Sequence, residues 1–255
     1  MTLLRAYEPW IFFAVILSAN AACVAAIQAG LMPAGPFSTG RFLILGACLF
    51  AVVLLSRGVT GLADLLKPLT VWRVRPGWIL FALLWGGIVG CVALVAFWIL
   101  TGNLPAASDF RPGLPFVPSV FRGILVAAVI GEIVWISYAL RRFESSLGAI
   151  GAGHLVGIVW ALWWLPMMLT NIAVVPDMPV GALFFAQTGV ALTCAFVYLS
   201  TRSGIAIFIL QFSFNSWLLV MPVSPGFGGS EIYWVFAVVN YALALGLLLA
   251  RQMRV

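Results

Sequence analysis

Eight stretches of the chain are almost free of charged residues, and this feature most limits what it can fold into. A hydrocarbon core about 30 Å thick is crossed by about 20 apolar residues of helix. The stretches therefore predict an all-α, polytopic membrane bundle of about eight transmembrane helices. They run approximately over 9–30, 42–55, 78–100, 118–140, 147–169, 180–199, 204–220 and 233–249.

The composition excludes a soluble domain. Only 8% of the 255 residues are charged and 64% are hydrophobic, whereas soluble domains carry about 25% charged residues. The net charge of +6 comes from basic residues scattered between apolar runs, so we expect no nucleic-acid partner. One histidine and four dispersed cysteines cannot form a zinc ligand set. We expect a single integral-membrane domain over 1–255, with no metal and no cofactor.

The basic residues predict the orientation. Short cytoplasmic loops are enriched in lysine and arginine. With an even number of helices and a cytoplasmic N-terminus, ten basic residues fall on the inner side and three on the outer side, and these three are Arg41, Arg111 and Arg122. Both termini are therefore predicted to be cytoplasmic, in what we expect to be a bacterial cytoplasmic membrane. Membrane lipids are the first expected partner.

Two connections have a distinctive composition. The segment 57–77 alternates basic residues with leucine, valine and tryptophan, which fits either a short interfacial helix on the inner leaflet or a plain basic loop. The segment 101–118 holds four prolines, and proline favours turns and irregular loops. We expect an irregular external connection there.

Glu132 is an acidic residue within the otherwise largely apolar predicted helix 118–140. It precedes Arg141 by nine residues, or about 14 Å of helix, which predicts a place near the bilayer midplane. An acid at that depth should face the bundle interior and have partners. Gln211 and Asn215 are four residues apart and share a helical face, at a depth that brackets Glu132. They are its predicted partners, in a catalytic or a purely structural cluster.

His154, the single histidine, lies between Gly153 and Gly157. Small residues four apart let a second helix approach closely, so His154 is predicted to lie at a helix interface. It is also a candidate binding residue. A Ser137–His154 dyad is conceivable, but no nucleophile motif supports it.

The stretch from Gly131 to Pro166 resembles the core of the CPBP family, the CaaX protease and bacteriocin-processing (Abi) group of intramembrane glutamic endopeptidases. The family core reads EExxWRGxLxxxL, then WxxxH or FxxxH before Leu-Pro, then HxxxN. Here Gly131-Glu132 stands at the paired glutamates and Trp135 at the family tryptophan. Trp160 keeps the aromatic residue, and Trp164 stands at the histidine before Leu165-Pro166.

The resemblance extends to the seventh helix, where Gln211 and Asn215 stand at HxxxN, while Ile136 replaces the family arginine. It implies a CaaX-protease-like core at about 118–222. In the family, the first glutamate and the histidine activate a water, and HxxxN stabilises the oxyanion. Glu132, Gln211 and Asn215 therefore stand at catalytic positions, and Trp135, Trp160, Trp164 and His154 at candidate binding positions.

The activating pair maps onto Gly131 and Trp164, neither of which can accept a proton from water. General base catalysis requires a titratable group near the nucleophile. The sequence therefore favours a proteolytically inactive homologue that binds a membrane-embedded or lipidated peptide or protein. The alternatives are an active CaaX-type endopeptidase using Glu132, with His154 approaching from the next helix, and a small proton-coupled transporter.

Overall fold

The described part of the chain is almost entirely helical. The structure is a computed structural model that describes residues 2–176 and 178–253. Its elements are α1 (Thr2–Gln28), α2 (Ala34–Leu66), the 3₁₀ helix η1 (Lys67–Thr70), α3 (Pro76–Thr101), the 3₁₀ helices η2 (Ala107–Asp109) and η3 (Leu114–Phe116), α4 (Pro118–Gly131), the π-helix η4 (Glu132–Leu140), α5 (Arg141–Thr170), α6 (Val180–Thr201), α7 (Gly204–Val220), α8 (Pro225–Gly228) and α9 (Ser230–Gln252).

Seven stretches of described helix are long and apolar enough to cross a membrane, and one of them, Pro118–Thr170, is 53 residues long. Gly148 breaks it with a backbone φ of 66°, a conformation that glycine adopts without strain. Trp135 before the break stacks on Trp160 after it, with ring centroids 5.3 Å apart, so the chain reverses there. The stretch therefore makes two crossings, and the predicted eight-helix membrane bundle is confirmed.

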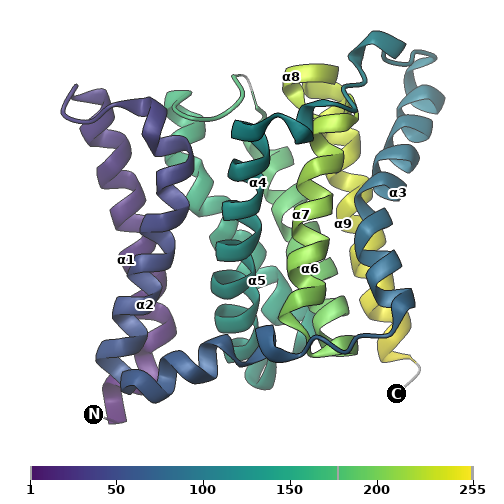
Figure 1. The fold of residues 1–255 in the computed structure, drawn as a ribbon. Helices are drawn as coiled ribbons and strands as arrows, with labels where there is room; N and C mark the ends of the chain where they lie inside the picture. The colour runs from purple at the N-terminus through teal and green to yellow at the C-terminus, as the bar shows by residue number, and fades with distance from the viewer. Residues whose placement is uncertain (1, 177, 254–255) are drawn as a thin grey trace.

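The beginning of α1 and the end of α9 lie on the same side of the bundle, as Figure 1 shows. We call this side the N-terminal face. The break at Gly58 lies near it, because the neighbouring Arg57 binds Glu8 in the first turns of α1. An even number of crossings requires this arrangement. That this face is cytoplasmic stays a prediction.

α2 is longer than the predicted 42–55 helix because it continues past the membrane crossing. Gly58, with a φ of 69°, turns the chain, and the remaining turns of α2 lead into η1 along the N-terminal face (Figure 1). The segment 57–77 thus contains short helix, as the first of its two interpretations expected. The proline-rich 101–118 connection contains only two short 3₁₀ helices.

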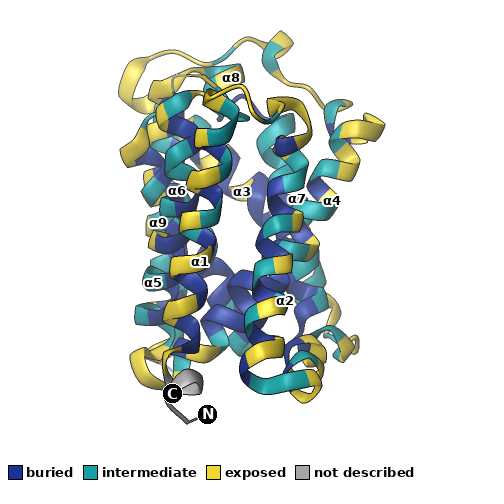
Figure 2. Cartoon of the chain, turned by 90° about the vertical axis from the view of Figure 1, so that its left-hand side faces the viewer, coloured by how far each residue is buried: buried dark blue, intermediate teal, exposed yellow. Residues whose placement is uncertain are grey.

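The interior is made mostly of aromatic and small apolar side chains. Figure 2 shows buried positions on the inward faces of the helices, and exposed ones on the outward faces and at both ends. Glycines permit the closest approaches: a Cβ on Gly157 of α5 would collide with the backbone of Thr188 in α6. Gly157 therefore lies at a close helix contact, as its spacing from Gly153 predicted.

Candidate functional site

Glu132 is fully buried at the start of η4. The Ser137 hydroxyl donates a hydrogen bond of 2.5 Å to its Oε1, and its Oε2 has no partner. The two residues are five apart. A π-helix repeats its backbone bonds at i→i+5, so five residues bring a side chain back to the same side, whereas an α-helix would place Ser137 on another face.

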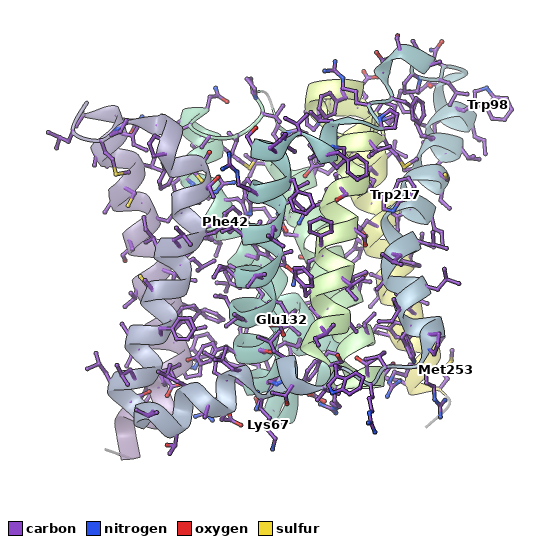
Figure 3. The ribbon with its side chains drawn as sticks, in the orientation of Figure 1. Phe42, Lys67, Trp98, Glu132, Trp217 and Met253 are labelled. Atoms are coloured by element: carbon purple, nitrogen blue, oxygen red, sulfur yellow. The ribbon has the colours of Figure 1, made fainter. Side chains whose placement is uncertain are left out.

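The predicted amide partners of Glu132 lie elsewhere. Gln211 Nε2 has no hydrogen-bond partner, so the expected contact between this amide and the carboxyl group is wrong. Gln211 Oε1 instead lies against Gly131, where a Cβ would collide with it. The Glu132 carboxyl group packs on Gly204, the first residue of α7, and Figure 3 shows Glu132 in the half of the bundle near Lys67. Glu132 is therefore nearer the N-terminal face than its predicted midplane position.

A cavity of about 90 Å³ is formed where five helices converge with the edge of α2. Its lining residue Phe42 lies farther from the N-terminal face than Glu132, as Figure 3 shows. The cavity has room for a few water molecules. Four of the predicted site residues line it: Trp160, Trp164, Gln211 and Asn215. The full lining is Phe42, Ala127, Trp160, Trp164, Ala186, Gln187, Val190, Gln211, Phe214, Asn215, Leu218, Tyr233 and Phe236.

The cavity lining is aromatic and carboxamide in character. None of these described residues supplies a carboxylate, an imidazole or a thiol, which are the usual groups that remove a proton from water near neutral pH. Three buried N–H donors of its lining residues have no protein acceptor: Trp160 Nε1, Trp164 Nε1 and Gln211 Nε2. The described lining thus offers carboxamide groups and no general base.

Trp164, at the family histidine position, lies against a buried cation. The Arg41 guanidinium carbon is 4.1 Å from its ring centroid, and only 6% of Arg41 is exposed. Arg41 Nη1 also contacts Met167 Sδ at 2.8 Å and donates to the Ala173 carbonyl at 3.2 Å. Attraction to aromatic faces is strengthened by desolvation, so Trp164 compensates part of the cost of burying this charge.

The other two predicted site residues do not line the cavity. Trp135 is fully buried behind it and stacks on Trp160. His154 lies at the α5–α9 contact, where its Nε2 is 3.0 Å from the Tyr241 hydroxyl and its Nδ1 is 2.8 Å from the Ile150 carbonyl. It therefore lies at a helix interface, as its flanking glycines predicted. The expectation that it approaches Glu132 is wrong, and so is the Ser137–His154 dyad, because Ser137 bonds Glu132.

Three residues of this region were not predicted as site residues. Ser137 was missed because α-helical spacing separates it from Glu132. Arg41 was assigned to the outer side as an ordinary loop charge, and nothing in its sequence neighbourhood indicates burial. Gln187 of α6, an isolated amide within an apolar helix, carried a usable signal, because polar residues in membrane helices tend to face the bundle interior.

Replacing Ser137 with alanine is expected to lower the free energy of unfolding by about 1–3 kcal/mol, because it leaves a buried acid without its hydrogen bond. SDS titration of the protein in mixed micelles measures this change. Ser216→Ala is the matched control, since the Ser216 hydroxyl donates only to the Phe212 carbonyl of its own helix. Equal losses for both variants would contradict a specific role for Ser137.

Comparison with known proteins places this site in a family context. Residues 113–217 match the family model for type II CAAX prenyl endopeptidase Rce1-like proteins. The match nearly coincides with the predicted 118–222 core, and it confirms the resemblance to CaaX proteases. It also contains Gly131, Glu132, Trp164 and Asn215. No curated protein matches the chain.

Proposed function

We propose that this integral membrane protein, whose residues 113–217 belong to the Rce1-like family of type II CAAX prenyl endopeptidases, binds a membrane peptide without cleaving it. The observation that carries the proposal is the cavity itself. Its described lining combines carboxamides with aromatic rings and lacks a carboxylate, imidazole or thiol that could activate water.

Hydrolysis of a peptide bond needs a base for the attacking water and donors for the developing oxyanion. The cavity retains donors, since Gln211 and Asn215 both line it. The base positions are occupied by Gly131 and Trp164. Glu132 does not replace them, because it does not line the cavity and its carboxyl group packs on Gly204 with Ser137 as its donor.

Carbonyl groups are the chemistry that the carboxamides of the lining fit best. A peptide presents one carbonyl oxygen per residue, and the carboxamides of Gln187 and Asn215 can both donate and accept. The volume of about 90 Å³ suits a peptide end or one side chain. The remainder of the partner, including any lipid group, would stay in the bilayer between the helices. The protein would thus hold a lipidated or membrane-embedded partner as a scaffold.

A two-part experiment tests this function on the purified full chain. A prenylated CAAX peptide is incubated with the protein in nanodiscs, and both peptide release and peptide binding are measured. We expect binding without release of the C-terminal tripeptide. We expect Asn215→Leu and Gln187→Leu to weaken binding about tenfold each, the effect of losing one hydrogen bond of about 1.4 kcal/mol. Ser216→Ala should leave binding unchanged.

Two outcomes would overturn the proposal. One is wild-type hydrolysis that disappears in Glu132→Gln, which would establish the competing function, an active endopeptidase using Glu132. The other is absence of both binding and hydrolysis. A further variant restores the family residues at three positions: Gly131→Glu, Trp164→His and Gln211→His are introduced together. The third change is included because Gln211 Oε1 occupies the space of a side chain at position 131.

A further inference from the structure

Residues 67–75, which we call the basic strap, cross the N-terminal face between α2 and α3. The strap consists of η1 followed by a non-helical segment. It is fixed to the bundle at two points: Pro68 is buried, and the Ser203 hydroxyl donates a 2.5 Å hydrogen bond to the Val71 carbonyl. Figure 1 shows that this part of the chain runs along the end of the bundle and does not span the membrane-crossing region.

The outward side of the basic strap is cationic and aromatic. Lys67, Arg73 and Arg75 are exposed, and within the described residues no ion pair joins them to a carboxylate. Trp72 is 67% exposed, and the Arg73 guanidinium carbon lies 4.9 Å from its ring centroid. Three positive charges and an indole ring therefore project from a segment that the bundle holds in place.

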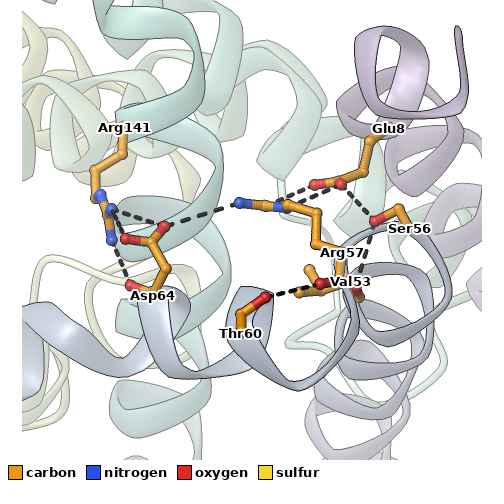
Figure 4. Close-up of polar contacts among 7 residues, drawn as sticks. All are labelled: Glu8, Val53, Ser56, Arg57, Thr60, Asp64 and Arg141. Atoms are coloured by element: carbon orange, nitrogen blue, oxygen red, sulfur yellow. Dashed lines mark hydrogen bonds and ion pairs between the residues drawn. The ribbon is translucent and has the colours of Figure 1, made fainter. Parts of the chain in front are cut away.

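Two other arginines of this face, Arg57 and Arg141, are engaged by carboxylates, as Figure 4 shows. Arg57 binds Glu8 through Nη2 at 2.6 Å and through Nε at 3.0 Å. Arg141 binds both carboxylate oxygens of Asp64 at 3.1 Å. Their charges are compensated by the protein itself. The three basic residues of the strap, in contrast, take part in none of the ion pairs of the described residues.

We propose that the basic strap is a binding site for the headgroups of anionic phospholipids in the leaflet at the N-terminal face. Clusters of basic residues beside a membrane attract anionic headgroups, and tryptophan favours the interfacial layer. Trp72 favours a lipid headgroup over a soluble anion as the ligand, because an exposed indole ring is more stable among lipid headgroups than in water. This inference is independent of what occupies the cavity.

Headgroup binding also bears on the position of Glu132. The strap residue Leu69 lies close to Gly204, the same residue on which the Glu132 carboxyl group packs. Lipid that holds the strap against the bundle therefore stabilises the packing beneath this buried acid. An anionic leaflet should raise the thermal stability of the whole protein, whereas a zwitterionic one should not.

The test titrates dioleoyl phosphatidylglycerol, or dioleoyl phosphatidylcholine, into the detergent-solubilised full chain. Bound lipid is counted by native mass spectrometry, and the unfolding temperature is followed in parallel. Each basic residue near an anionic surface contributes about fivefold to affinity. The combined variant Lys67→Gln, Arg73→Gln and Arg75→Gln should therefore lose about a hundredfold in phosphatidylglycerol affinity, with phosphatidylcholine binding unchanged. The matched control, Arg111→Gln with Arg122→Gln, alters basic residues of the opposite face.

Retained phosphatidylglycerol affinity in the triple variant would overturn the proposal, and so would an equal loss in the control. Equal binding of the soluble headgroup glycerophosphoglycerol would also overturn it, by identifying a soluble-anion site. If the triple variant does not fold, the wild type still decides. Raising salt from about 0.05 M to about 0.5 M shortens the screening length severalfold, so phosphatidylglycerol binding should weaken strongly, and salt-independent binding would contradict the proposal.

Discussion

Replacing Gly157 with leucine is expected to destabilise the protein strongly and to lower its folded yield. A Cβ at position 157 would overlap the backbone of Thr188 in α6, and the same helix pair is already tight at Gly153, where a Cβ would lie 2.7 Å from Leu192 Cδ2. Overfilling a packed interface costs about 3 kcal/mol or more, a large part of a total stability of about 5–15 kcal/mol. Yield of monodisperse protein and SDS titration measure the loss.

Gly246 supplies the matched control for this change. It lies in α9, and a Cβ added at this position would have no heavy atom within 4 Å, so leucine there extends into open space. Leucine is also a better helix former than glycine by up to about 1 kcal/mol. We therefore expect Gly246→Leu to fold at least as well as the wild type. Similar behaviour of the two variants would contradict the assigned α5–α6 contact.

Replacing Arg57 with methionine is expected to lower the free energy of unfolding by about 3 kcal/mol. Glu8 is completely buried, and its carboxylate accepts two hydrogen bonds from Arg57 and one of 2.5 Å from Ser56. Removing one partner of a buried ion pair leaves the other charge uncompensated, which costs about 3–5 kcal/mol. The lower figure applies because Arg57 is itself 20% exposed.

Two further variants distinguish this effect from a general loss of charge. Glu8→Gln combined with Arg57→Met should recover most of the stability, because no buried charge is then left alone. Arg202→Met breaks the Arg202–Glu144 pair, in which Arg202 is 57% exposed, and exposed pairs contribute at most about 1 kcal/mol. SDS titration compares all three. A double variant as unstable as Arg57→Met would refute the ion-pair explanation.

The architecture was predictable because it follows from hydropathy alone. A membrane segment must satisfy its backbone hydrogen bonds internally, so each long apolar stretch had to be a helix, and the basic residues divided the loops into two sides. The eight crossings and the site residues Trp160, Trp164, Gln211 and Asn215 followed from sequence, and these four residues are found together. The family core followed from the stretch 131–166, in which Trp160 and Trp164 precede Leu165-Pro166.

The surroundings of Glu132 were not predictable in this way. The partners of Glu132 were predicted from α-helical spacing, and no feature of the sequence of Glu132–Leu140 indicates that this segment forms a π-helix. The π-helix aligns Ser137 with the acid. The burial of Arg41 was equally hidden, because it depends on aromatic rings of α5 more than 120 residues away in the chain. Contacts between distant segments leave no local sequence pattern.

The contact of Arg41 with Trp164 has a consequence for how easily this chain could accept the family histidine at position 164. Histidine at position 164 alone would remove the ring on which the buried guanidinium lies and set a second basic group beside it. Taking up the family histidine at position 164 would therefore cost folding stability unless Arg41 changes with it. Glutamate at position 131, in contrast, would only require the flexible Gln211 carboxamide to move aside.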